Sequence, residues 1–125
     1  MPTTIMIVDD AEIVRKLVRG ALNGSEDTDF LEAKEATEAL KIAREHRGPI
    51  HLLISDVVMP GKASGVEMAA MLCEARPETK VLLMSGYAPE VATMKPEWNF
   101  VQKPFTALEI GDRVRGILTE NYLAA

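Results

Sequence analysis

The chain has 125 residues, of which 47% are hydrophobic and 26% charged, a balance that favours one folded domain over residues 1–125. Its net charge of −5 disfavours nucleic acid as a partner, because an acidic surface repels phosphates. The lone cysteine excludes an internal disulfide and a cysteine-based zinc site, and it fits a cytoplasmic location. No apolar run approaches the ~20 residues that are needed to cross a membrane.

Short apolar runs alternate along the chain with segments whose apolar residues recur every three or four positions. The runs predict strands, and the spaced segments predict helices. In chain order we expect a strand at residues 5–8, a helix at 13–22, a strand at 29–33, a helix at 36–46, a strand at 51–55, a helix at 66–75, strands at 81–84 and 99–102, and a helix at 108–122. The apolar stripe of the first helix includes Ile13 and Leu17.

A further helix is expected between the fourth and fifth strands, and it should be short or irregular. Pro89 and Pro96 lie in that stretch, and proline is tolerated in the first turn of a helix but not in its interior. We therefore expect about two turns or less there. Five strands and five helices in strict alternation predict βαβ units and a parallel α/β sheet with helices on both faces.

Charged residues and a serine directly follow the apolar runs that predict four of the strands. Asp9 and Asp10 follow the first strand, Asp56 the third, Ser85 the fourth and Lys103 the fifth. In a parallel sheet the carboxyl ends of the strands lie at one edge, and ligands of doubly wound folds bind beyond that edge. We therefore expect the carboxylates, the hydroxyl and the ammonium group of these residues to converge there.

Carboxylates crowded together repel one another, and a divalent cation relieves the conflict. Oxygen ligands in an open cleft favour Mg²⁺, which keeps several waters and takes one or two protein carboxylates. With Mg²⁺ bound, one carboxylate oxygen can attack phosphorus and form an acyl phosphate. Mg²⁺ and Lys103 would supply positive charge to the phosphoryl oxygens, and Ser85 would supply a hydroxyl donor.

The segments that carry these residues resemble the signature of the response-regulator receiver family. They are Asp9-Asp10, Ser-Asp-Val-Val-Met-Pro at residues 55–60, Ser85-Gly86 and Lys103-Pro104-Phe105. The resemblance spans nearly the whole chain and implies a single receiver domain over residues 1–125. The implied fold is a flavodoxin-like doubly wound sheet with strand order 2-1-3-4-5. Residues 56–61, 84–87 and 102–105 are most similar to receivers associated with hybrid sensor histidine kinases.

The resemblance also implies a role for each acid. Asp56 would be the phosphoacceptor, and Asp10 would bind Mg²⁺ directly while Asp9 helps to hold the waters of the metal. The backbone carbonyl of Val58 would be a further metal ligand. Lys103 would pair with Asp56 at rest and with the phosphoryl group after transfer.

A conformational switch is implied as well. Ser85 would bond a phosphoryl oxygen and move toward it, after which Phe100, at the aromatic switch position, would rotate inward. That movement would repack the face around the fourth helix, the fifth strand and the fifth helix. Val58 and Tyr87 would flank the phosphorylation pocket and govern access of hydrolytic water. The peptide bond before Pro104 would be cis.

The implied partners are a histidine kinase or histidine phosphotransfer protein and a downstream target, with the chain a monomer or a weak homodimer. The sequence leaves three alternative functions to weigh. A phosphatase with an aspartate nucleophile needs a second carboxylate where Val58 stands. A flavin-binding module needs a hydroxyl- and glycine-rich loop where residues 9–12 are mostly acidic. A docking domain without phosphorylation would not need every acid, hydroxyl and lysine position filled. We therefore expect a signalling switch and not a turnover enzyme.

Overall fold

The computed structural model describes residues 2–23, 27–61, 63–86 and 95–124, with side chains described as far as residue 119. Its elements are β1 (Thr3–Val8), α1 (Glu12–Leu22), β2 (Thr28–Ala33), α2 (Ala36–Glu45), β3 (Leu52–Asp56), α3 (Gly65–Ala75), β4 (Lys80–Ser85), β5 (Asn99–Gln102) and α4 (Ala107–Ala124). All of the strands expected from the sequence are present, and so are the helices expected outside the stretch between β4 and β5. Their ends lie within two residues of the expected positions.

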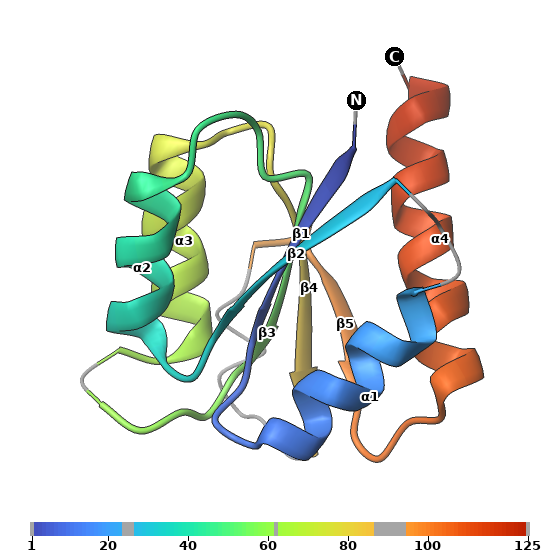
Figure 1. Cartoon of the computed structure of the whole chain (residues 1–125), viewed down its shortest axis with the longest axis horizontal. Coiled ribbons are helices and arrows are strands. Elements are labelled where there is room, and N and C mark those ends of the chain that lie inside the picture. The colour runs from blue at the N-terminus through green and yellow to red at the C-terminus, as the bar shows by residue number, and fades with distance from the viewer. Residues whose placement is uncertain (1, 24–26, 62, 87–94, 125) are drawn as a thin grey trace.

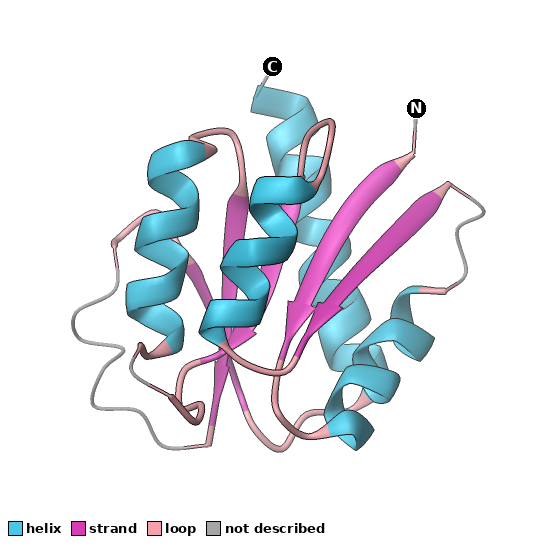
Figure 2. Ribbon diagram, turned by 60° about the vertical axis from the view of Figure 1, so that its left-hand side comes forward, coloured by secondary structure: helices cyan, strands magenta, loops and turns pink. Residues whose placement is uncertain are grey.

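The strands form one parallel sheet in the order β2-β1-β3-β4-β5, which confirms the predicted fold class and strand order. After β2 the chain crosses back to the other side of β1, so the switch point of the sheet lies between β1 and β3. The strand arrows point the same way in both overall views, and the two chain ends lie at the opposite edge (Figures 1 and 2). In such sheets, the carboxyl edge at the switch point is where ligands bind.

Helices cover both faces of the sheet, α2 and α3 on one side and α1 and α4 on the other (Figure 1). Alternate residues of β1 pack into the two hydrophobic cores, one on each face of the sheet. Met6 and Val8 pack with α2 and α3, whereas Ile5 and Ile7 pack with α1 and α4. Strands covered on both faces need apolar residues at nearly every position, which is why they stand out in the sequence as continuous apolar runs. The resulting scaffold holds the strand ends in fixed positions.

The predicted apolar stripe on α1 is wrong at two positions. Ile13 and Leu17 are 78% and 39% exposed. The face of α1 that is buried consists of Val18, Leu22 and a charged residue, Arg15. Because these three residues are spaced by three and four, they lie on one side of the helix. A charged side chain thus takes an inward position that apolar periodicity does not reveal.

The short helix expected between the fourth and fifth strands stays a prediction, because residues 87–94 of that stretch lie outside the described residues. Within the described ranges the structure has four helices, so the C-terminal helix is labelled α4. In the part of the chain that the structure describes, no helix has both the length and the apolar character that crossing a bilayer requires.

Candidate functional site

Acidic side chains from two neighbouring strands meet at the carboxyl edge of the sheet. Asp9 and Asp10 directly follow β1, and Asp56 is the last residue of β3. These two strands are hydrogen-bonded neighbours, with Val8 opposite Ser55. Each acid offers a carboxylate oxygen, and these oxygens all lie within 4.8 Å of one another. Asp9 and Asp56 are buried and Asp10 is exposed, so the acidic cluster of Asp9, Asp10 and Asp56 opens to solvent on one side.

Lys103 reaches the acidic cluster from the loop that follows β5. Its Nζ donates to Oδ2 of Asp9 at 2.8 Å and lies 3.4 Å from Oδ1 of Asp56. Its backbone N–H donates to the carbonyl of Ser85 at 2.9 Å, and the peptide bond to Pro104 is cis, as expected. The expected ion pair between Lys103 and Asp56 is therefore present, and the structure adds a shorter contact between Lys103 and Asp9 that was not expected. The order of residues in the sequence does not show which of two acids on adjacent strands lies closer to the lysine.

The charges of the acidic cluster are only partly balanced. Burial raises the pKa of Asp56, and the charges of Asp9 and Asp10 add to this effect while Lys103 opposes it. For Lys103, burial acts to lower the pKa, but the hydrogen bond and charge of Asp9, together with Asp56, outweigh it and raise the pKa. Lys103 therefore stays protonated at neutral pH. One ammonium group cannot offset three carboxylates, so the cluster retains negative charge.

The acidic cluster suits a hard divalent cation. Among the residues that the structure describes, it is the one group of three or more His, Cys, Asp or Glu residues whose ligand atoms come this close. The donors are all carboxylate oxygens, and the exposed side leaves space for water to complete a coordination shell. Carboxylate and water ligands are those that Mg²⁺ prefers. The residues present therefore fit Mg²⁺.

The backbone that follows Asp56 is held between β4 and α3. The N–H of Val57 donates to the carbonyl of Met84 at 3.0 Å, and the N–H of Gly65 donates to the carbonyl of Val57 at 2.8 Å. A Cβ added at Gly65 would lie only 1.9 Å from the carbonyl oxygen of Asp56. This position therefore requires glycine. The sequence shows only a glycine at the end of a loop, and the close approach becomes visible once α3 is placed against β3.

The other site residues expected from the sequence are Ser85, Val58, Phe100 and Tyr87. Ser85 is buried and ends β4, the strand next to β3. Val58 lies two residues beyond Asp56 and is 58% exposed. Phe100, in β5, is partly buried and packs against the core that α2 and α3 cover. Tyr87 lies outside the described residues. Ser85 thus shares the carboxyl edge with the acids, while Phe100 lies one strand further along the sheet.

The fold and the site define a doubly wound α/β domain with an acidic, lysine-paired cluster at the switch point of its sheet. The family model for the response regulator receiver domain matches residues 5–115. The chain therefore belongs to the receiver-domain family of two-component signalling.

Two relatives illustrate where the chain stands in that family. It is 28% identical over 121 residues to the sensor kinase CckA of Brucella abortus, an alignment that covers 92% of this chain and 12% of the kinase. It is 36% identical over 72 residues to the polar-differentiation response regulator DivK of Brucella anthropi, covering 58% of this chain and 55% of DivK. The chain therefore corresponds to only part of the length of each relative.

Solved structures agree with this assignment. A CheY-like receiver domain protein from Methanospirillum hungatei superposes with a TM-score of 0.84 over the whole of both chains, and its 20% identity supports the fold alone. The receiver domain of the hybrid histidine kinase CckA is 32% identical, with a TM-score of 0.71 and coverage of 92% of this chain and 98% of that one. The predicted similarity to receivers of hybrid sensor kinases is confirmed.

Proposed function

We propose that this receiver domain, spanning residues 1–125, accepts a phosphoryl group on Asp56 in a Mg²⁺-dependent reaction with a phosphohistidine donor. The acidic cluster carries the proposal, because its carboxylate oxygens lie within 4.8 Å of one another. Lys103 contacts two of the acids, at 2.8 Å from Asp9 and 3.4 Å from Asp56. A cation site beside a lysine-paired carboxylate provides both the nucleophile and the positive charge that phosphoryl transfer needs.

In the proposed reaction an oxygen of Asp56 forms a bond to phosphorus while the bond between phosphorus and the donor imidazole nitrogen breaks. The electron pair of the broken bond returns to the imidazole. Asp10, the carbonyl of Val58 and an oxygen of Asp56 would hold Mg²⁺, and Asp9 would hold its waters. When bound, Mg²⁺ supplies positive charge that offsets the carboxylates and the oxygens of the transferring group.

Other residues would bind the phosphoryl group and change conformation when it is attached to Asp56. Lys103 would pair with one phosphoryl oxygen, and the Ser85 hydroxyl would donate to another. Because the aspartyl phosphate adds roughly two negative charges, Ser85 would be drawn toward it. Phe100 would then rotate inward and repack the face made by the segment after β4, by β5 and by α4. A replacement of Ser85 by Ala should therefore uncouple phosphorylation from that repacking.

The aspartyl phosphate should have a moderate to long lifetime. Val58 and Tyr87 would flank the pocket, and their apolar and bulky side chains would restrict hydrolytic water. Val58 also brings no carboxyl group to the position where a phosphatase would need an acid. We therefore propose a switch that catalyses its own phosphorylation and dephosphorylation and does not turn over phosphate esters.

The proposed donor is a histidine kinase or a histidine phosphotransfer protein, and the proposed receiver of the signal is a downstream protein. The chain would act as a monomer or a weak homodimer. The similarity to the receiver of a hybrid histidine kinase supports a phosphorelay as the setting.

A direct test uses a small acyl phosphate as donor. With Mg²⁺ present, the intact mass of the chain should increase by one phosphoryl group, and with the metal chelated it should not change. Asp56→Asn should remain unmodified under both conditions. Asp29, exposed on β2, provides the matched control, since Asp29→Asn removes a carboxylate far from the carboxyl edge and should be modified like the wild type.

Two results would contradict the proposal. Modification of Asp56→Asn to the wild-type extent would place the phosphoryl group on another residue. A wild-type chain that stayed unmodified with both Mg²⁺ and donor, and with a phosphorylated histidine phosphotransfer protein, would favour a docking domain that signals without phosphorylation.

A further inference from the structure

Asp9 is held through every polar atom of its backbone and side chain. Its N–H donates to the carbonyl of Ala33 at 3.1 Å, and its Oδ1 accepts the N–H of Ala11 at 2.9 Å. Its Oδ2 accepts from Lys103 at 2.8 Å. Its carbonyl oxygen accepts from Nη1 of Arg15 at 2.7 Å. The last contact comes from α1, outside the acidic cluster, and it holds the backbone and not the carboxylate.

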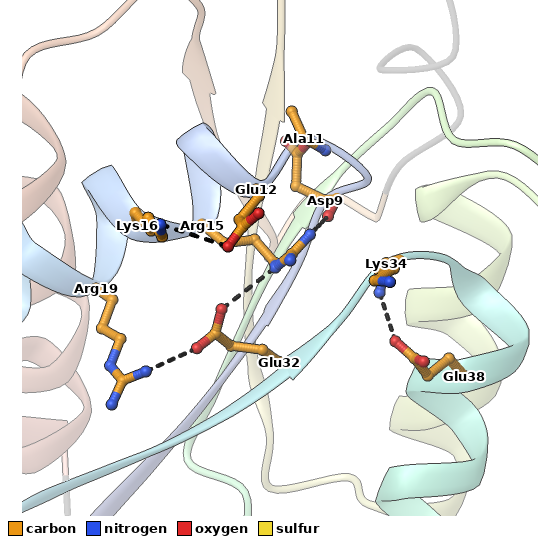
Figure 3. A network of polar contacts seen from close by, with 9 residues as sticks. All are labelled: Asp9, Ala11, Glu12, Arg15, Lys16, Arg19, Glu32, Lys34 and Glu38. Atoms are coloured by element: carbon orange, nitrogen blue, oxygen red, sulfur yellow. Dashed lines mark hydrogen bonds and ion pairs between the residues drawn. The ribbon is translucent and has the colours of Figure 1, made fainter.

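Arg15 is itself held from β2. Its Nε donates to Oε1 of Glu32 at 3.2 Å, and the other oxygen of Glu32 accepts from Arg19 at 3.0 Å. Figure 3 shows Arg15 lying between the carboxylate of Glu32 and the carbonyl of Asp9. Arg15 is only 8% exposed, and a buried guanidinium group is stable only when it is paired. The Glu32 contact therefore restricts the arginine to the orientation in which it meets Asp9.

We propose that Arg15 is a positioning residue for the Mg²⁺ site, which holds the Asp9 carbonyl and thereby aims the carboxylate of Asp10. The inference rests on the proposed function, in which Asp10 is a metal ligand. A peptide unit is planar, so a bond to the oxygen of Asp9 also restricts the nitrogen of Asp10. The Asp10 side chain is exposed, and within the described ranges it makes no hydrogen bond or ion pair. Its direction therefore depends on the backbone that carries it.

Arg15 should act through position more than through charge. Glu32 pairs with it and cancels most of the field that the guanidinium group would add at the acidic cluster. Arg15 also makes no described contact with Asp56 or Lys103, the residues proposed to react and to bind the phosphoryl group. Loss of Arg15 should therefore weaken Mg²⁺ binding and leave the maximal rate of phosphoryl transfer nearly intact.

The test compares the full chain with Arg15→Met and Arg15→Lys. The dissociation constant of Mg²⁺ is measured by calorimetric titration with the metal alone, and the phosphorylation rate by a small acyl phosphate is measured over a series of Mg²⁺ concentrations. Arg15→Met should weaken Mg²⁺ binding by about 10- to 100-fold, the usual range when a group that orients a metal ligand is lost. The rate at saturating Mg²⁺ should stay within about threefold of the wild type. Arg15→Lys, which retains one donor, should show a smaller loss.

Arg19→Met is the matched control. It removes the other ion pair of the same Glu32, but Arg19 is more exposed and does not contact Asp9. Its dissociation constant for Mg²⁺ should stay within about twofold of the wild type, since exposed ion pairs contribute little. Circular dichroism and urea unfolding would establish that each variant is folded at the temperature of the titration.

The outcomes separate this inference from the proposed function. A folded Arg15 variant that binds Mg²⁺ as tightly as the wild type would overturn the inference and leave the proposed function standing. A wild-type chain that neither binds Mg²⁺ nor becomes phosphorylated would overturn both. If Arg15→Met does not fold, the same measurements are made on Arg15→Lys. The amide resonance of Asp10 in metal-free protein should then shift in Arg15→Lys and not in Arg19→Met, and unchanged resonances with unchanged affinity would overturn the inference.

Discussion

At Gly65 the first turn of α3 touches the backbone of the proposed phosphoacceptor. The Cβ of an alanine would lie 1.9 Å from the carbonyl oxygen of Asp56, and that atom belongs to the rigid backbone at the end of β3. Gly65→Ala should therefore destabilise the fold by about 3 kcal/mol, the upper part of the range for overpacking a buried site. Urea unfolding would measure the loss as a lower midpoint with an unchanged slope. Phosphorylation should also slow, because the Asp56 backbone must shift.

Gly116, on the exposed face of α4, is the matched control. An added Cβ there would meet no atom within 4 Å. Because alanine is the better helix former, Gly116→Ala should stabilise the chain by about 0.5–1 kcal/mol. Equal effects of the two substitutions would show that the close approach at Gly65 is not a constraint.

Asp56 should weaken the metal-free fold at neutral pH. Burial raises its pKa in the folded chain, so the neutral form is the one that folding favours. The stability linked to this group is fully present below the pKa of the unfolded chain and is lost as the pH rises through the higher folded pKa. Asp56→Asn should therefore be more stable than the wild type at neutral pH without Mg²⁺, by about 1 kcal/mol. Urea unfolding across the pH range would measure the difference.

The pH dependence distinguishes this cause from a general effect of removing an acid. The advantage of Asp56→Asn should disappear as the pH falls toward the ordinary aspartate pKa of about 3.9. Asp29→Asn, on the exposed side of β2, should change stability by less than about 0.5 kcal/mol. An Asp56→Asn chain less stable than the wild type at neutral pH would contradict the prediction.

At the scale of the elements, the strands and their ends could be predicted from the sequence. Strands buried on both faces consist of unbroken runs of apolar residues. The polar residue that ends each run then lies at the carboxyl edge of a parallel sheet. Asp9, Asp56, Ser85 and Lys103 could be assigned to one edge in this way, and their placement follows from topology alone.

Contacts between elements could not be predicted, because periodicity describes one element at a time. In the sequence, Arg15 is a charged residue that interrupts the apolar stripe of α1, and the pattern predicts that it is exposed. It is buried, because Glu32 of β2 pairs with it. Ile13 belongs to the same stripe and is exposed. The approach of Gly65 to Asp56 depends on how α3 meets β3, and nothing local to either segment signals it.

At the scale of the whole molecule, the acidic cluster exists only when the sheet has formed. Asp10 follows β1, Asp56 ends β3 and Lys103 follows β5, so the unfolded chain keeps these groups far apart. A cation that binds the cluster therefore binds the folded state alone and stabilises the entire domain by mass action. Mg²⁺ affinity and global stability should in consequence change together.

Free Mg²⁺ at about 100 times its dissociation constant should raise the free energy of unfolding by about 2.7 kcal/mol. In Asp10→Asn, which replaces a proposed ligand, most of this rise should be absent at the same concentration. Asp112→Asn on α4 removes an exposed carboxylate that pairs with Arg115, and it should keep the full rise. Urea unfolding with and without Mg²⁺ measures all of these values. An equal rise in the Asp10 and Asp112 variants would mean that the metal stabilises the chain through diffuse surface charge, because only binding at the acidic cluster depends on which carboxylate is removed.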